Sequence, residues 1–229
     1  MANLNDIIQW CDQTLAAREF KDYAPNGLQI EGKSEVNKIL CAVTASQSAI
    51  EAAIEQGADL LLVHHGYFWK GEAYPITGMR GKRIKTLIQH DISLVGYHLP
   101  LDSHPTLGNN AAIADLLELE NIEQLDPSEK RPIGNIGYLK QPMSPEDFKN
   151  YVSEKLGFDA IHLPAEKTQI HKVGFCTGGA QDYIQKAALQ DCDAYISGEV
   201  SERTFYEAQE LNVHCLLYTS DAADDMQCV

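Results

Sequence analysis

Hydrophobic positions near the N-terminus recur with the spacing of an amphipathic helix. Leu4, Ile7, Ile8, Cys11 and Leu15 recur at intervals of three and four residues, so they share one side of a helix with about 3.6 residues per turn. We therefore expect an N-terminal helix that buries one face.

Short apolar runs then alternate with helix-like segments. Turn-forming residues in APNGLQIEG, where Asn26 is interpreted as a turn residue, precede the first of these runs. The pattern predicts strands at 38–43, 58–63 and 92–97 and helices at 46–55, 82–90 and 109–119. Such alternation is typical of a mostly parallel sheet with helices on its faces.

The same pattern restarts after the polar stretch EQLDPSEKRPIGN. It predicts strands at 136–140, 171–176 and 193–197 and helices at 144–157, 181–190 and 201–211. We therefore expect an α/β protein with two similar halves, residues 1–126 and 127–229, each with a mostly parallel central sheet and helices on the faces.

An internal repeat is compatible with the sequence. Residues 39–65 align without gaps with residues 173–199, which sets Asp59 over Asp193 and His65 over Glu199. Any two strand–helix–strand units share such an apolar pattern, so the sequence leaves duplication open. If the repeat is real, we expect equivalent strand ends to face each other across a cleft between the halves, a common position for a binding site.

Composition narrows the classes of function. The 229 residues include 18 Lys and Arg against 33 Asp and Glu, a formal net charge of −15, which argues against nucleic acid or an anionic membrane as a partner. Asp6 and Asp12 fall where a signal peptide would be basic and then apolar. Six cysteines without a C-x-x-C pair indicate reduced thiols. We expect a cytoplasmic protein.

Candidate metal ligands follow two neighbouring strands of the predicted sheet. His64 and His65 end one strand, and His98, Asp102 and His104 follow the next. Open parallel sheets bind ligands beyond the carboxyl ends of their strands, and imidazole and carboxylate suit zinc, iron, manganese or nickel. Adjacent side chains on a strand point to opposite faces, so the two neighbouring histidines share a site only where the chain leaves the sheet. Ordinary surface histidines remain the alternative, and His104 is interpreted as a turn residue.

Two other segments carry weaker signals. CTGGAQ could bind a phosphate at a helix start but lacks the lysine and the spacing of a P-loop, so a tight turn is the simpler interpretation. GYFWKG places two aromatic residues and Lys70 beside the histidines. It could stack on a planar ring or simply cover the sheet edge.

The ordered set of motifs resembles a known family. YAPNGLQIEG, GADLLLVHHGYFWKG, YHLPLDSHPTLGNNAA, CTGGAQ and DAYISGEVSERT are similar to the NIF-three-like dinuclear-metal-centre family, whose bacterial members carry the name GTP cyclohydrolase 1 type 2 homologue. The likeness runs from near the N-terminus to about Val213. It implies two α/β halves assembled into a toroidal homohexamer, with paired divalent metal ions lining the inner cavity.

The resemblance also implies roles for individual residues. His64, His65 and Asp102 match metal ligands, and His98 and Glu199 match polar residues beside the metals.

The chain departs from the family near its C-terminus. A GHH-x-x-E loop of the family supplies a further histidine and glutamate, but this chain reads VHCLLY and then TSDAADDMQCV. His214 aligns with the strand before that loop, and the spacing of Asp221, Asp224 and Asp225 gives little support for them as substitutes. We therefore expect a sequence truncated or altered after about residue 217, an incomplete metal site, and lower metal occupancy and stability than in a full-length relative.

Two functions remain open at this point. The first is a hydrolase with two divalent metal ions that acts on a nucleotide or another small phosphorylated or cyclic amide compound, with His98 as proton carrier and Glu199 orienting water or ligand. The second is a non-catalytic hexamer that stores or senses metal or serves as a scaffold. A plain nucleotide-binding module is disfavoured, because G-x-G-x-x-G and P-loop signals are missing from the sequence.

Overall fold

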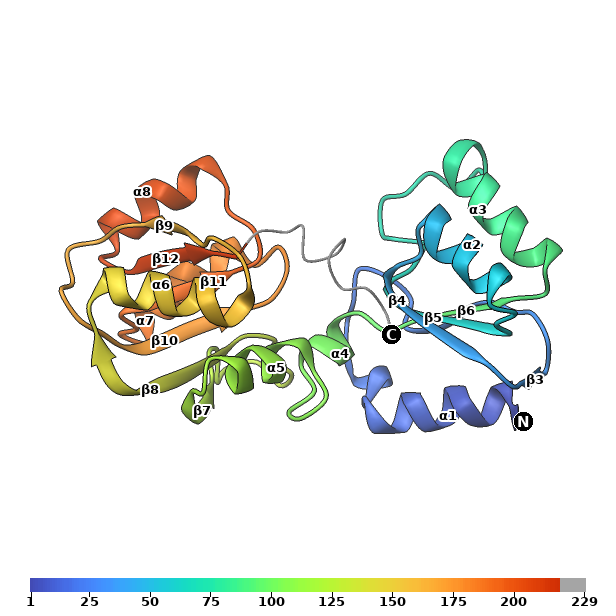
Figure 1. The fold of residues 1–229 in the computed structure, drawn as a ribbon, viewed down its shortest axis with the longest axis horizontal. Helices are drawn as coiled ribbons and strands as arrows, with labels where there is room; N and C mark the ends of the chain where they lie inside the picture. The colour runs from blue at the N-terminus through green and yellow to red at the C-terminus, as the bar shows by residue number, and fades with distance from the viewer. Residues whose placement is uncertain (219–229) are drawn as a thin grey trace. The chain divides into compact units, whose positions relative to one another are not determined.

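The chain folds into two compact α/β units (Figure 1). The computed structural model describes residues 1–218. Met1–Leu101 form the first unit, and the second begins at Asp102. The expected boundary at residue 126 lies later in the chain than this division. Strand β7 (Glu120–Gln124) pairs with β8 (Asn135–Met143) of the second unit. Residues 102–126 therefore belong to the second unit.

The first unit has a four-stranded sheet in the order β2-β6-β5-β4 among the described residues. Strands β4, β5 and β6 are parallel, and β2 runs antiparallel to β6 at one edge. The elements are β1 (Ala2–Asn3), α1 (Leu4–Thr14), a 3-10 turn (Ala17–Glu19), β2 (Gly27–Ile30), β3 (Glu35–Val36), β4 (Ile39–Thr44), α2 (Gln47–Glu55), β5 (Leu60–His65), α3 (Gly78–Gln89), β6 (Ser93–Gly96) and α4 (Leu99–Asp102).

Both faces of this sheet are covered by helices (Figure 1). Along β5, Leu61 packs in a core with residues of α2 and α3, whereas Leu60 packs in a second core with residues of α1. This alternation is what a strand with helices on both faces requires. The predicted N-terminal helix is confirmed, and it begins where Asn3 accepts a hydrogen bond from the Asn5 N–H at 2.9 Å.

The second unit has a six-stranded sheet in the order β7-β8-β10-β11-β12-β9 within residues 102–218. The three strands β10, β11 and β12 are parallel, and their direct neighbours β8 and β9 run antiparallel to them. The elements not yet given are α5 (Asn109–Leu116), α6 (Pro145–Leu156), β9 (Ile161–Leu163), β10 (Ile170–Cys176), a 3-10 turn (Gln181–Tyr183), α7 (Ile184–Leu189), β11 (Ala194–Ser197), α8 (Glu202–Glu210) and β12 (His214–Leu217).

The two units share their strand register, which supports the internal repeat. Ile39 pairs with Leu60 in the first unit, and Val173 pairs with Ala194 in the second, the positions that the gapless sequence alignment superimposes. The next three pairs along each ladder also correspond.

Equivalent polar contacts precede the aligned strands β5 and β11. Asp59 accepts hydrogen bonds from Lys33 Nζ at 2.8 Å and the Asn37 N–H at 2.9 Å. Asp193 accepts them from Lys167 Nζ at 3.1 Å and the His171 N–H at 3.0 Å. Because these contacts recur at aligned positions, the halves are similar in detail as well as in topology.

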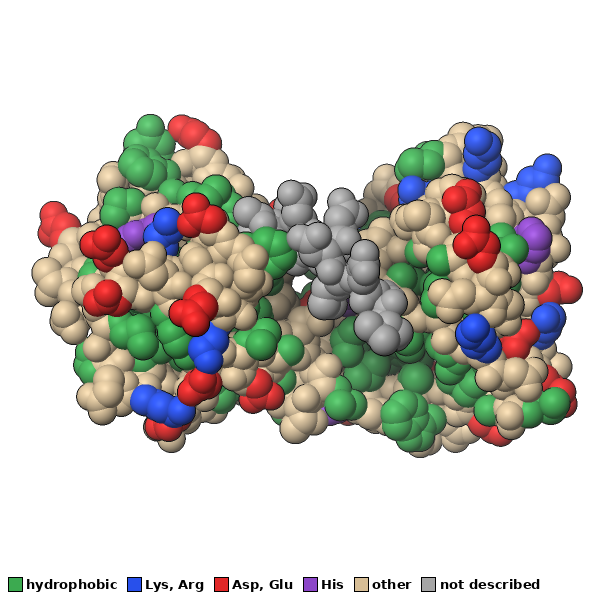
Figure 2. All heavy atoms as spheres, viewed as in Figure 1, with side chains coloured by type: hydrophobic (Ala, Val, Ile, Leu, Met, Phe, Trp, Pro, Cys, Tyr) green, Lys and Arg blue, Asp and Glu red, His purple; other side chains and the backbone are tan. Residues whose placement is uncertain are grey.

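The face of the molecule shown in Figure 2 is mixed in charge. On the face shown in Figure 2, Lys and Arg side chains are scattered among Asp and Glu side chains in both units. Among residues 1–218, no helix combines the length and apolar character needed to cross a bilayer.

Candidate metal centre

Three histidines of the first unit meet at the carboxyl end of its sheet. His64 and His65 are the last residues of β5, and His98 follows β6 by two residues. Strands β5 and β6 are parallel neighbours, so both deliver their carboxyl ends to the same edge. One ring nitrogen from each histidine can be chosen so that all three lie within 4.8 Å of one another.

The adjacent histidines converge because the strand ends there. Their ring centroids are 4.4 Å apart, and the ring planes are tilted by 41°. Gly66 follows directly, and a Cβ at this position would lie 2.1 Å from Oε1 of Gln29. That amide oxygen accepts the Tyr67 N–H at 2.8 Å. A glycine at this position thus leaves room for the Gln29 amide that holds the chain just after β5.

A backbone carbonyl sets the tautomer of His64. Its Nδ1 lies 2.9 Å from the carbonyl oxygen of Tyr97, and a carbonyl only accepts, so Nδ1 carries the proton and donates. The lone pair of this imidazole is therefore on Nε2. This arrangement is typical of metal-binding histidines, whose second nitrogen donates to a carbonyl or carboxylate.

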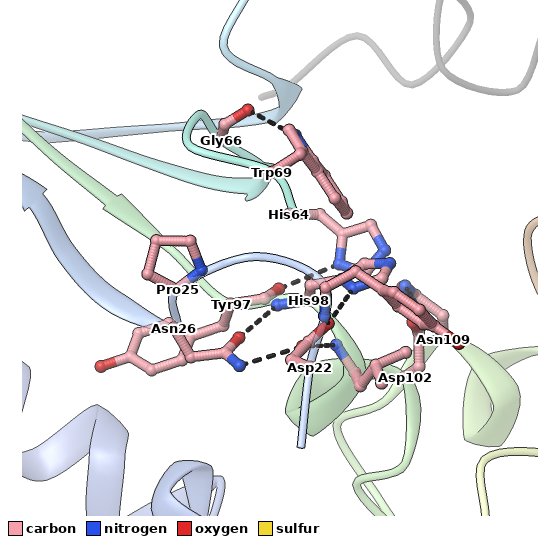
Figure 3. Close-up of polar contacts among 12 residues, drawn as sticks. Asp22, Pro25, Asn26, His64, Gly66, Trp69, Tyr97, His98, Asp102 and Asn109 are labelled. Atoms are coloured by element: carbon pink, nitrogen blue, oxygen red, sulfur yellow. Dashed lines mark hydrogen bonds and ion pairs between the residues drawn. The ribbon is translucent and has the colours of Figure 1, made fainter. Parts of the chain in front are cut away.

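The carboxylate of Asp22 sets the tautomer of His98 (Figure 3). His98 Nδ1 donates to Oδ1 of Asp22 at 2.7 Å, and the His98 backbone N–H donates to Oδ1 of Asn26 at 2.8 Å. Asn26 Nδ2 in turn donates to Oδ2 of Asp22 at 2.9 Å. Burial opposes the charge of Asp22, but hydrogen bonds from His98, Asn26 and the Tyr23 N–H together lower its pKa to about 2. Asp22 is therefore ionised at neutral pH.

His65 is neutral at physiological pH. Burial, and then the neighbouring His64 and His98, lower the pKa of His65 to about 4. Its Nδ1 lies 3.4 Å from Oγ1 of Thr44. A neutral imidazole is the form that binds metal ions.

The donor set fits a divalent metal ion. Neutral imidazole nitrogens suit zinc, iron and nickel, and the proton positions on His64 and His98 place their lone pairs on Nε2. Among residues 1–218, these three histidines are the one group of three or more His, Cys, Asp or Glu whose ligand atoms all lie within 4.8 Å of one another. The cluster could therefore hold a metal ion.

The other predicted ligand and the predicted glutamate belong to the second unit. Asp102 is buried, and its Oδ1 accepts hydrogen bonds from Asn109 Nδ2 at 2.8 Å and Thr177 Oγ1 at 3.2 Å. Glu199 is exposed just after β11, and its N–H lies 3.4 Å from Oγ of Ser197. Their predicted roles, and the expected position of the site between the halves, stay predictions.

The remaining acidic candidates and His214 are elsewhere. Asp221, Asp224 and Asp225 lie outside the described residues. His214 is buried in β12, where its Nδ1 lies 3.0 Å from Nε2 of His162.

The sequence did not predict Asp22 as part of the site, and it predicted Asn26 only as a turn residue. Asp22 lies 76 positions before His98 in the chain, and no local spacing connects the two. Asn26 was interpreted as a turn residue, but its side chain also bridges Asp22 and the His98 backbone. The sequence signal that could have indicated this contact is the pair Asp22 and Asn26, which lie four residues apart in the loop that leads into β2.

Comparisons with known proteins agree on the family. The Duf34/NIF3 (NGG1p interacting factor 3) family profile matches residues 2–219. A Haemophilus influenzae protein named GTP cyclohydrolase 1 type 2 homolog is 50% identical over 216 residues, which is 93% of this chain and 85% of that protein. A Vibrio cholerae protein of the same name is 49% identical over 205 residues, or 89% and 81% of the two chains.

Solved structures show the same fold. One described as protein ybgI of unknown function has a TM-score of 0.91 and 40% sequence identity, and the match covers 97% of this chain and 89% of that one.

Proposed function

Because the chain belongs to the Duf34/NIF3 family, we propose that it binds divalent metal ions through His64 and His65 and hydrolyses a nucleotide or another small phosphorylated or cyclic amide compound. One observation carries this proposal. Three imidazoles meet at a strand edge, and the two whose protons can be placed hold them on Nδ1, through a carbonyl and a buried carboxylate. Histidines that serve only as surface residues need no such arrangement.

A divalent ion supplies Lewis acidity, which polarises a carbonyl or phosphoryl oxygen of a substrate. His64 and His65 are the proposed ligands from the first unit. The Tyr97 carbonyl holds a proton of His64 on Nδ1, and burial lowers the pKa of His65, which makes that ring a neutral donor. No proton has to be removed from His65 at neutral pH before it binds an ion.

His98 is the proposed proton carrier. Ionised Asp22 holds the His98 proton on Nδ1, so Nε2 is the atom that accepts a proton from an attacking water and returns it to a leaving group. The imidazolium formed in between is stabilised by the Asp22 carboxylate. The same Nε2 could instead serve as a third metal ligand, and the experiments below separate the two roles.

Further features of the proposal rest on the resemblance to the family. These are a second metal ion, Asp102 as a ligand, Glu199 orienting water or ligand, and a homohexameric ring. The name of the relatives suggests a guanine nucleotide as the first substrate to test, although a shared fold does not license a substrate.

Turnover tests the proposal. Purified wild-type chain, His64→Ala and His90→Ala would be loaded with Zn²⁺, Mn²⁺, Fe²⁺ or Ni²⁺ and screened against nucleotides and cyclic amides. His90 is an exposed histidine at the end of α3, so its variant is a matched control. We expect activity in the wild type and His90→Ala and its loss in His64→Ala with the fold intact. Metal binding by His64 without any turnover would favour the storage or scaffold function instead.

A further inference from the structure

We propose that Trp69 contacts the substrate and that its indole packs against a planar heteroaromatic ring, such as a nucleobase, held beside the histidine cluster. This inference rests on the proposed function, because it names the substrate class of the same site. It assigns a role to one of the aromatic residues for which the sequence left stacking and sheet-edge cover equally open.

Trp69 lies directly against the proposed metal centre (Figure 3). The centroid of its ring is 4.9 Å from that of His98, with the planes at 77°, and 5.9 Å from that of His65. This edge-to-face angle means that the imidazole of His98 is not stacked on the indole. The side chain is partly exposed. A ligand that reaches the histidines therefore meets this ring.

Hydrogen bonds fix the orientation of the indole. Its Nε1–H donates to the carbonyl oxygen of Gly66 at 3.0 Å, and its backbone N–H donates to Oε2 of Glu72 at 3.1 Å. The next residue, Lys70, donates its N–H to the Tyr23 carbonyl at 2.6 Å. The polar edge of the ring is thus occupied by the protein, and what the ring can offer a ligand is its apolar face.

The loop that carries Trp69 is itself held in place. Arg80 on α3 donates to Oε2 of Glu72 at 2.7 Å, to the Pro75 carbonyl at 3.1 Å and to the Ala73 carbonyl. Phe68, just before Trp69, has a φ of 65°, a left-handed conformation that bulky residues rarely adopt. A residue that merely covers a sheet edge does not need this restraint, whereas a preorganised stacking surface gains affinity from it.

Planar rings suit such a surface better than other small molecules. Indole faces stack on any nucleobase with little dependence on its hydrogen-bonding pattern, and losing one stacking aromatic typically weakens binding about 5- to 150-fold. A ring seated on Trp69 would bring the bonds near it close to His65 and His98. The geometry thus favours a nucleotide over an acyclic phosphate or a non-aromatic amide.

Tryptophan fluorescence offers a direct test, because the sequence holds two tryptophans, Trp10 and Trp69. Trp10 is 64% exposed on α1, so Trp10→Phe should fold normally and leave Trp69 as the only indole. Trp69→Phe is the matched control that leaves Trp10 alone. Each variant would be titrated with GMP and with ribose 5-phosphate, in the presence of Zn²⁺.

We expect saturable quenching of Trp10→Phe by GMP, little response to ribose 5-phosphate, and neither response in Trp69→Phe. By calorimetry, Trp69→Leu should bind GMP about tenfold more weakly than the wild type does. Equal GMP affinity in the two chains, or no saturable quenching of Trp10→Phe, would overturn the inference.

A Ni²⁺ titration of Trp10→Phe separates this outcome from failure of the proposed function. Nickel bound at the histidines should quench the adjacent Trp69, and adding His64→Ala should abolish that response. Nickel quenching without any GMP effect would reject the stacking role alone. A missing nickel response would instead count against the metal site.

Discussion

Nδ1 of His98 and Oδ1 of Asp22 lie 2.7 Å apart, although 76 positions separate the two residues in the chain. The side chain of Asp22 is only 3% exposed and also accepts the Leu99 N–H at 2.9 Å. The carboxylate therefore fixes both the imidazole and the start of α4. The hydrogen bond between these residues fixes the orientation of the His98 ring beside His64 and His65.

Removing Asp22 should weaken the metal centre if His98 is a ligand. Partners of this kind typically contribute 10- to 100-fold to metal affinity, so we expect Asp22→Ala to lower Zn²⁺ affinity about tenfold and Asp22→Asn, which keeps an acceptor, to lower it less. Competition with a chromogenic chelator measures the affinity. If His98 is instead the proton carrier, Zn²⁺ affinity stays near wild type while turnover falls.

The control for this experiment is Asp159→Ala, which removes an exposed carboxylate of the second unit. Wild-type affinity and wild-type turnover in Asp22→Ala, at unchanged thermal stability, would contradict any functional role for the Asp22–His98 pair.

The repeated aspartates should contribute similarly to stability. Asp59→Ala and Asp193→Ala each leave backbone N–H groups and a lysine without their acceptor, so each should cost about 1–3 kcal/mol in free energy of unfolding. Lys33→Met removes only the half-exposed partner, so it should destabilise the chain less than either aspartate substitution. Urea denaturation measures all three. A negligible effect of one aspartate beside a large effect of the other would contradict the structural equivalence of the two units.

Stability should fall as the pH drops below about 6.5, the ordinary pKa of histidine, and His162 should contribute to the slope. Nε2 of His214 donates to the Lys167 carbonyl at 2.7 Å, so its Nδ1 accepts the His162 Nε2–H at 3.0 Å. Burial first, and then His214 and Lys149, lower the pKa of His162 in the folded state.

Protonation of His162 lowers the free energy of unfolding. Between its ordinary pKa and its lower folded pKa, His162 binds more protons in the unfolded chain, so acid favours unfolding. We expect His162→Gln to have a shallower loss of unfolding free energy between pH 7 and pH 5 than the wild type. Urea titrations at several pH values give the slopes, and identical slopes would reject the assignment to His162.

Much of the fold could be predicted because it depends on local periodicity. The predicted strands 58–63 and 171–176 bury apolar side chains, and 38–43 partly buries Leu40 and Ala42; the structure confirms them as β5, β10 and β4. Strand β7, in contrast, was not predicted, because all its residues are exposed and it forms only by pairing with β8. The periodicity likewise does not show that residues before 126 join the second unit through this pairing.

The candidate site, too, could be predicted only in part from the sequence. Adjacent histidines at the end of an apolar run, with a third after the next strand, could be predicted to meet because parallel strands share an edge. The partners that orient them could not be. The Tyr97 carbonyl is backbone, and Asp22 reaches His98 from a loop that leads into an antiparallel edge strand, β2, which the periodicity did not indicate.

Metal content tests the central claim most directly. Wild-type chain, the His64→Ala/His65→Ala double variant and the control His90→Ala would be incubated with Zn²⁺, Mn²⁺, Fe²⁺ or Ni²⁺, passed through a desalting column and analysed by elemental mass spectrometry. We predict that the wild type and the control retain one of these metals and that the double variant loses it. Equal metal content in all three chains, or no metal in the wild type, would contradict a metal centre at these histidines.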